Sequence, residues 1–173
     1  MLRSAPLRWF GLTFATVLLD RASKAWFESQ TVEGWRHELI HNFVYLVHSR
    51  NPGLAFGVLS EVPSLQTRMV FIVGSLAIIA VISWFLIAGG YAGSSLTAAG
   101  LALVLGGATG NVTDRILHGA VTDFLEVWLG SYRWPAFNVA DSAITVGAIL
   151  VLVDVLFISK HGARPSRKGA QDA

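Results

Sequence analysis

The chain has 173 residues, of which 53% are hydrophobic and only 14% are charged, and its formal net charge is +2. A soluble domain usually carries about 25% charged residues, whereas residues 69–113 contain no Asp, Glu, Lys or Arg at all. This composition excludes a water-soluble fold, a disordered chain and a nucleic-acid binder. Because there is no Cys, disulfides, thiolate catalysis and Cys-ligated metals are excluded as well. The sequence therefore predicts a small polytopic membrane protein.

The first apolar run extends from about residue 7 to residue 27. Its basic N-terminal end, followed by a short apolar stretch, is also typical of a cleavable signal peptide. No clear small-residue cleavage site follows, however, and further apolar runs come later in the chain. We therefore predict that residues 7–27 form a first membrane span, even though charged residues lie in its second half: Asp20, Arg21 and Lys24.

Three further runs, residues 70–89, 96–112 and 140–159, approach the roughly 20 apolar residues that cross a bilayer. The Gly/Ser-rich segment 89–95 predicts a tight turn, and the many Gly and Ala residues of the run after it suit close helix packing. The predicted fold class is a membrane all-α protein, a bundle of four transmembrane helices. Residues 1–160 would form a single integral membrane domain.

Lys and Arg residues gather at both ends of the chain, and such residues mark the cytoplasmic side. Four spans place both termini on that side, so residues 28–68 and 114–138 become outer loops and residues 161–173 a cytoplasmic tail. In the first outer loop, β-prone runs at 42–48 and 54–59 flank strong turn signals. We expect a small strand-rich cap on the extracytoplasmic surface.

Ionisable groups at membrane depth cost several kcal/mol and are candidates for function. Asp20 and Lys24 are spaced i, i+4, in the order that favours an ion pair on a helix. We interpret them as a structural polar pair. Asp114, next to Arg115 at the end of the third span, could serve the same structural purpose.

Asp123 and Asp141 flank the second outer loop, Asp123 shortly after the third span and Asp141 where the fourth span begins. A short loop would bring both to the same membrane face. Two carboxylates held a few Å apart cannot both ionise, so they share a proton. The ionised member could take a proton from water that attacks an amide, while the protonated member polarises the carbonyl and later protonates the leaving amine. Spacing alone leaves open that both residues merely cap helix starts.

Five blocks of sequence carry further information, and they fall in order between residues 20 and 143. They are DRASK (20–24), NPGLAFG (51–57), GGATGNVTDR (106–115), VTDFL (121–125) and WPAFNVADSA (134–143). Together they resemble the lipoprotein signal peptidase (signal peptidase II) family of bacterial aspartic peptidases. The four-span layout, the length and the outer cap agree with this resemblance. Leu54 departs from it locally, because a smaller residue is expected there.

The resemblance implies a peptidase of the bacterial cytoplasmic (inner) membrane, with its active site near the extracytoplasmic face. It would remove the signal peptide from a prolipoprotein by cutting just before the S-diacylglyceryl cysteine, without a cofactor. Its partners would be this lipid-modified substrate and membrane lipid, and nothing demands more than a monomer. The resemblance implies Asp123 and Asp141 as the catalytic dyad. It assigns substrate binding to Asn51, Gly53, Asn111, Arg115 and Asn138, although Arg115 could instead hold the loop beside Asp114.

A rival hypothesis comes from His37-Glu-Leu-Ile-His41, which matches the H-E-x-x-H pattern of zinc proteases. That pattern needs a helix, so that both His side chains share one face and the Glu acts as the base. Here the segment runs directly into a β-prone stretch in the outer loop. We therefore favour an exposed polar edge of the cap, with no metal bound.

A non-enzymatic hypothesis is a small proton-coupled transporter, in which Asp20, Asp141 and Asp154 would form a relay. Asp154 lies 13 residues beyond Asp141, which is about 20 Å along a helix. Inverted repeats or paired broken helices would support a transporter, and the sequence contains neither. The peptidase remains the favoured interpretation.

Overall fold

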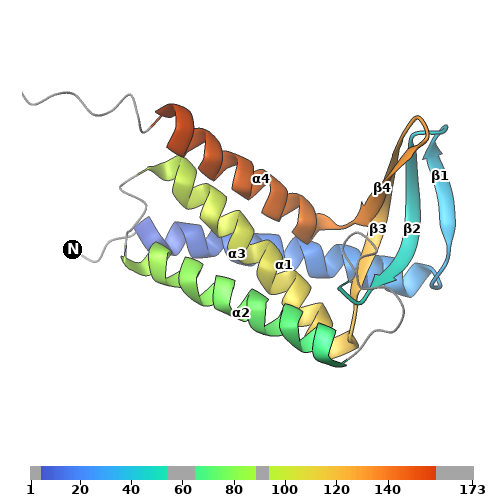
Figure 1. Ribbon diagram of the computed structural model, residues 1–173, viewed down its shortest axis with the longest axis horizontal. Helices are drawn as coiled ribbons and strands as arrows, with labels where there is room; N and C mark the ends of the chain where they lie inside the picture. The colour runs from blue at the N-terminus through green and yellow to red at the C-terminus, as the bar shows by residue number, and fades with distance from the viewer. Residues whose placement is uncertain (1–4, 54–64, 89–93, 159–173) are drawn as a thin grey trace, which may run out of the picture.

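The computed structural model describes residues 5–53, 65–88 and 94–158 (Figure 1). Their helices are α1 (Ala5–Gln30), α2 (Leu65–Ala88), α3 (Ser95–His118) and α4 (Val139–Val153), which continues into a π-helical turn, Asp154–Ile158. Their strands are β1 (Arg36–Ile40), β2 (Val44–Asn51), β3 (Val121–Leu129) and β4 (Tyr132–Phe137). The helices lie side by side and the strands stand at one end of the bundle (Figure 1).

Several predicted features lie outside the described residues. They include Leu54 and the β-prone run 54–59, most of the turn 89–95, and the tail 161–173. The structure therefore does not test them.

Three helices contain a stretch that is long and apolar enough to cross a membrane: Arg68–Ala88, Ser95–His118 and Val139–Phe157. α1 has 26 residues, but it is not among them because charged side chains interrupt its apolar sequence. Large apolar side chains of α2 and α4 are exposed, with Trp84 of α2 at 70% and Leu152 of α4 at 57%. An exposed apolar surface of this kind is suited to contact with lipid. The structure thus supports three of the predicted spans by length and composition.

The strand-rich cap is confirmed as an antiparallel sheet with the order β1-β2-β3-β4. It is built from both predicted outer loops, whereas β-prone runs were predicted in the first loop and none in the second. Residues 121–137 are rich in β-branched and aromatic side chains and turn back at Gly130, which favours a hairpin. In addition, α3 continues to His118, beyond the predicted end of the third span at residue 112.

The pairing of β2 with β3 positions the functional residues, since these strands come from different loops. Ser49 lies opposite Asp123, and Asn51 lies opposite Val121. Asn51 and Asp123 are therefore near neighbours at the end of the sheet where α3 leads into β3 (Figure 1).

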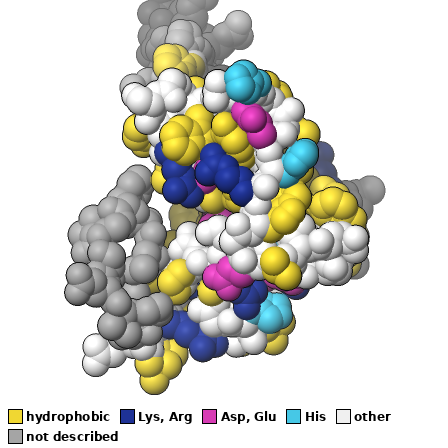
Figure 2. Space-filling view, turned by 90° about the vertical axis from the view of Figure 1, so that its right-hand side faces the viewer, with side chains coloured by type: hydrophobic (Ala, Val, Ile, Leu, Met, Phe, Trp, Pro, Cys, Tyr) yellow, Lys and Arg dark blue, Asp and Glu magenta, His cyan; other side chains and the backbone are white. Residues whose placement is uncertain are grey.

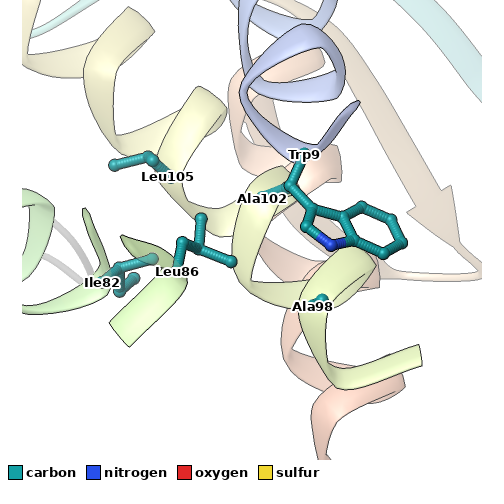
Figure 3. Close-up of a cluster of buried hydrophobic side chains, with 6 residues drawn as sticks. All are labelled: Trp9, Ile82, Leu86, Ala98, Ala102 and Leu105. Carbon is teal, nitrogen blue, oxygen red and sulfur yellow. The ribbon is translucent and has the colours of Figure 1, made fainter. Parts of the chain in front are cut away.

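At the other end of the bundle, apolar side chains of three helices form a buried cluster (Figure 3). Leu86 of α2 is almost fully buried against α3, where Ala98 and Ala102 leave room for larger neighbours. The cluster consists of Trp9, Ile82, Leu86, Ala98, Ala102 and Leu105. It joins α1, α2 and α3 by dispersion contacts and shape fit, which drive helix association in lipid.

The α3–α4 interface depends on glycines. A Cβ atom placed on Gly147 would lie 2.5 Å from the carbonyl oxygen of Gly100, and one placed on Gly100 would lie 2.6 Å from that of Gly147. Small residues let helix backbones approach closely. The Gly-rich composition of the third run therefore serves the packing that the sequence predicted.

The substitution Gly147→Ala is expected to destabilise the protein, because its methyl group would meet backbone that cannot move aside. Overpacking of this kind costs about 1–3 kcal/mol. Gly11→Ala is the matched control, since no atom lies within 4 Å of a Cβ at that helical position. Thermal unfolding in detergent should show a lower Tm for Gly147→Ala only. Equal Tm values for the two variants would contradict the close approach of α3 and α4.

Candidate active site

Asp123 and Asp141 lie together where the sheet meets the bundle, and Asn138 connects them. The Asn138 side-chain amide donates to Asp123 Oδ1 at 2.7 Å, and its backbone N–H donates to Asp141 Oδ2 at 3.3 Å. Asn138 Oδ1 accepts from the Asp141 backbone N–H at 2.9 Å, which completes a capping box at the start of α4. Because its oxygen is engaged there, the amide nitrogen of Asn138 must point toward Asp123.

Two further Asn side chains hold the remaining carboxylate oxygens. Asn51 donates to Asp123 Oδ2 at 3.2 Å, while its own oxygen accepts from the Gly53 backbone N–H at 2.9 Å. Asn111 donates to Asp141 Oδ1 at 2.8 Å. Gly53 has φ +113°, and a Cβ there would collide with the ring of Phe71, so this turn requires glycine.

The two carboxyl groups differ in their surroundings. Asp123 is only 2% exposed, whereas Asp141 is partly exposed. Burial, and next the charge of Asp141, raise the pKa of Asp123 from its ordinary value of 3.8 to about 7, although hydrogen bonds from Asn51 and Asn138 act to lower it. A pair with these properties can hold one proton between two carboxyl groups near neutral pH.

Arg115 lies on α3 beside this pair. Its guanidinium stands 5.3 Å from the centre of the Phe71 ring and interacts electrostatically with Asp141 and Asp123. Its buried Nε has no hydrogen-bond partner in the part of the chain that the structure describes. Buried donors are rarely left unpaired, so this N–H is available to a bound group.

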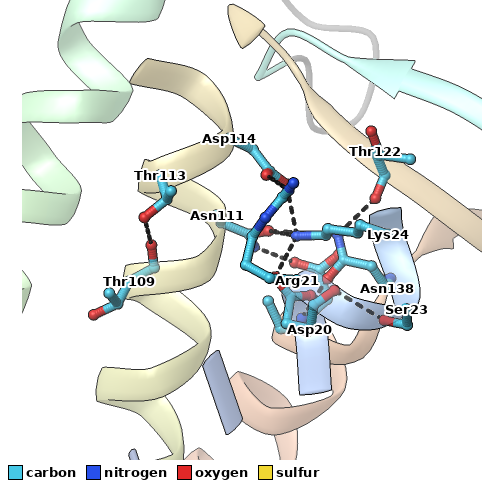
Figure 4. A network of polar contacts seen from close by, with 12 residues as sticks. Asp20, Arg21, Ser23, Lys24, Thr109, Asn111, Thr113, Asp114, Thr122 and Asn138 are labelled. Atoms are coloured by element: carbon cyan, nitrogen blue, oxygen red, sulfur yellow. Dashed lines mark hydrogen bonds and ion pairs between the residues drawn. The ribbon is translucent and has the colours of Figure 1, made fainter. Parts of the chain in front are cut away.

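The remaining predicted polar residues form a buried charge cluster between α1 and α3 (Figure 4). Lys24 donates to Asp20 Oδ2 at 2.7 Å and lies 2.8 Å from Asp114 Oδ2, and all three side chains are fully buried. Asp114 also pairs with Arg21. The expected pairing of Asp114 with Arg115 is replaced by these ion pairs, because the side chain of Asp114 faces α1.

Glu126 is a buried carboxylate that sequence reasoning did not single out. It lies 2.5 Å from Arg133 and 3.0 Å from Arg36, in the sheet end of the molecule, where basic and acidic side chains gather (Figure 2). Trp128 Nε1 also donates to it at 2.7 Å. The sequence carries no signal of these contacts, because they depend on how the strands pair.

Neither rival hypothesis finds its residues assembled. His37 and Glu38 lie on strand β1, which is exposed along its length, and His41 contacts Glu38 at 3.2 Å. The helix required by the H-E-x-x-H pattern is thus replaced by a strand. Asp154 accepts from Thr97 at the end of the bundle that lies far from Asp141, so the proposed proton relay is not connected in the residues described.

Comparison with known proteins identifies the family. A family model described as signal peptidase (SPase) II matches residues 12–157. The chain belongs to the signal peptidase II family. It is 42% identical over 153 residues to the lipoprotein signal peptidase of Janthinobacterium sp. (strain Marseille), covering 88% of this chain and 90% of that protein. It is 38% identical over 167 residues to that of Solibacter usitatus (strain Ellin6076), covering 95% and 96%.

Two solved structures, each described as a bacterial membrane enzyme, share the fold of this signal peptidase II family member. One has a TM-score of 0.77 and 27% identity over 95% of this chain and 94% of the solved chain. The other has a TM-score of 0.75 and 28% identity over 87% and 94%. The resemblance drawn from the five sequence blocks is confirmed, and the chain is a peptidase of a family of bacterial membrane enzymes.

Glu38→Gln is expected to leave peptidase activity unchanged, because Glu38 lies on an exposed strand away from the Asp123–Asp141 pair. The variant and the parent should be assayed in detergent with and without a strong zinc chelator. Loss of activity in Glu38→Gln, together with inhibition by the chelator, would revive the zinc hypothesis.

Proposed function

We propose that this chain is an intramembrane aspartic endopeptidase that removes signal peptides from prolipoproteins by cutting just before the S-diacylglyceryl cysteine. Asp123 and Asp141 would be its catalytic dyad. The observation that carries this proposal is that both carboxyl groups are hydrogen-bonded to Asn138, while the pKa of the buried member is near neutral. Membership of the signal peptidase II family supports the substrate class.

In the proposed reaction the partly exposed Asp141 takes a proton from water as the water oxygen bonds to the scissile carbonyl carbon. Asp123 gives its proton to the carbonyl oxygen, so a neutral tetrahedral intermediate forms. As the C–N bond breaks, Asp141 returns its proton to the leaving nitrogen and Asp123 recovers its own from the intermediate. The dyad ends as it began, and no cofactor is needed.

The five residues assigned to substrate binding would divide into three roles. The amides of Asn51, Asn111 and Asn138 already donate to the dyad, so we assign them to holding the carboxylates. Arg115 is the stronger candidate for contact with substrate, because its buried Nε is unpaired among the described residues. Gly53 would keep the chain close to the ring of Phe71 and free of a side chain that blocks the site.

A pocket of about 340 Å³ gives the dyad access to lipid. It is predominantly apolar, and it opens beside Asp141 along the outward side of α4. Its lining residues are Trp134, Phe137, Asp141, Ser142, Thr145 and Val146. A predominantly apolar pocket whose lining includes the carboxyl group of Asp141 suits a substrate that joins a peptide to acyl chains.

The proposed enzyme sits in the cytoplasmic membrane of a bacterium as a monomer with four spans and a single membrane domain over residues 1–160. Here α1 is the fourth span, because Asp20 and Lys24 are buried inside the bundle and paired rather than facing lipid. The basic chain ends place both termini and the tail 161–173 in the cytoplasm. The sheet and the dyad then lie at the extracytoplasmic face.

Asp123→Asn and Asp141→Asn should each abolish cleavage of a diacylglyceryl-modified prolipoprotein by purified protein in detergent. Removal of a general acid or base costs on the order of 10²–10⁴-fold in rate. Both variants should fold, since Asn keeps the shape and one acceptor oxygen. Glu33→Gln, at an exposed carboxylate, serves as the matched control, and the unlipidated precursor as the substrate control. Substantial activity in either dyad variant would refute the assignment.

The pH dependence should follow Asp123. Its pKa of about 7 means that the protonated form is lost as the pH rises through neutrality, so kcat/KM should fall on the alkaline side. The apparent pKa of this alkaline fall in kcat/KM belongs to the coupled pair of carboxyl groups rather than to one residue. A pH–rate profile that stays flat well above pH 7 would exclude Asp123 as the proton donor.

A further inference from the structure

Lys24 is one of the buried charged residues that the proposed mechanism does not use. Its side chain is 0% exposed, and three oxygens surround the ammonium: Asp20 Oδ2 at 2.7 Å, Asp114 Oδ2 at 2.8 Å and Asn111 Oδ1 at 3.1 Å (Figure 4). A lysine ammonium has three N–H donors and no acceptor. The contacts with Asp20 and Asn111 are hydrogen bonds and the contact with Asp114 is an ion pair, so one donor of the ammonium is directed to a residue of the candidate site.

The contact with Lys24 determines which way the Asn111 amide faces. Asn111 Oδ1 also accepts from the side-chain amide of Asn138 at 3.4 Å, so two donors hold the oxygen. The NH₂ group must then point away from them, and it donates to Asp141 Oδ1 at 2.8 Å. A flipped Asn111 would place its NH₂ against the ammonium and its oxygen against the Asp141 carboxylate, and both contacts would be repulsive.

We propose that Lys24 is a positioning residue of the dyad, which fixes the Asn111 amide as a hydrogen-bond donor to Asp141 and so keeps Asp141 as the ionised member, with the shared proton on Asp123. The inference rests on the proposed aspartic mechanism. Lys24 acts through two successive hydrogen bonds, from its ammonium to the Asn111 amide and from that amide to the Asp141 carboxylate. Each of these hydrogen bonds polarises the next. Lys24 does not touch the substrate.

The charge of Lys24 also acts on Asp123 directly, but most of it is balanced within the cluster, so the hydrogen bonds through Asn111 are the specific connection to Asp141. Lys24 is flanked by two carboxylates, and one of these also pairs with Arg21, so little net charge remains in the cluster. Among the residues that the structure describes, several charged or titratable groups face the dyad and this cluster: Asp20, Arg21 and Glu28 from α1, Arg50 from β2, Asp114, Arg115 and His118 from α3, and the two dyad members themselves.

A simpler role for Lys24 would be that of a counter-ion for Asp20 and Asp114, which is purely structural. Lys24→Met alone would not separate the two roles, because it leaves buried carboxylates without their cation and endangers folding. The double variant Lys24→Met with Asp20→Asn removes one charge of each sign. Asp20→Asn alone is its matched control, since it keeps Lys24 and its N–H bond to Asn111.

The test compares these two variants in the prolipoprotein cleavage assay. Asp20→Asn sets the baseline for kcat and for the pH profile, because it alters the contact with the Ala140 N–H but keeps the contact of Lys24 with Asn111. The double variant should fold with a Tm close to that of Asp20→Asn, keep its KM, and lose about 10- to 100-fold in kcat, as for a lost hydrogen bond to a charged group. Its kcat/KM–pH profile should also differ from that of Asp20→Asn, because the hydrogen bond from Asn111 to Asp141 is no longer held in place by Lys24.

Each result has a definite meaning. A double variant with the kcat and pH profile of Asp20→Asn would overturn the positioning role, and Lys24 would be structural only. If Asp123→Asn and Asp141→Asn are inactive in the same assay, the aspartic mechanism stands despite that result. If either dyad variant is active, the proposed mechanism itself fails, and the inference about Lys24 fails with it.

Discussion

A lysine ammonium inside a helix bundle must be surrounded by acceptors, because an unpaired buried charge is very costly. In this protein the acceptors of Lys24 come from α1 itself and from two positions one turn apart on α3. This requirement fixes how α1 and α3 lie against each other. Asp20 extends the constraint to the third partner, since its Oδ1 accepts from the backbone N–H of Ala140 at 2.9 Å. The start of α4, and with it Asp141, is therefore placed by the same cluster.

The sheet supplies the other half of the site. Asp123 lies on a strand whose neighbour β2 carries Asn51, and the pairing of these strands joins two loops that are far apart in the sequence. Phe124 on β3 also stacks on Phe27 of α1, with ring centres 4.6 Å apart, which anchors the sheet to the bundle. The carboxyl groups thus lie between two rigid units, and the Asn138 side chain connects them.

Much of this arrangement could be predicted, and the exceptions have physical reasons. Topology alone predicted that Asp123 and Asp141 lie at the same membrane face, because two antiparallel helices joined by a short loop bring the ends that flank the loop together. The β3–β4 hairpin was missed although residues 121–137 carry a local signal for it, whereas the pairing of β3 with β2 could not be predicted because the two strands lie far apart in sequence. The contact of Lys24 with Asn111 was missed because it depends on the rotation of two helices about their axes, and sequence spacing within one helix says nothing about that.

Asp141 is at once the third residue of the capping box that begins α4 and a member of the proposed dyad. Its backbone N–H and its carboxylate are both hydrogen-bonded to Asn138. The start of the helix and the proposed peptide hydrolysis therefore both depend on the side chains of Asn138 and Asp141. Few replacements at either position would satisfy both demands. Selection under an inhibitor that contacts these groups would therefore find little room for escape, since a change that weakens the drug would also disturb the helix or the reaction.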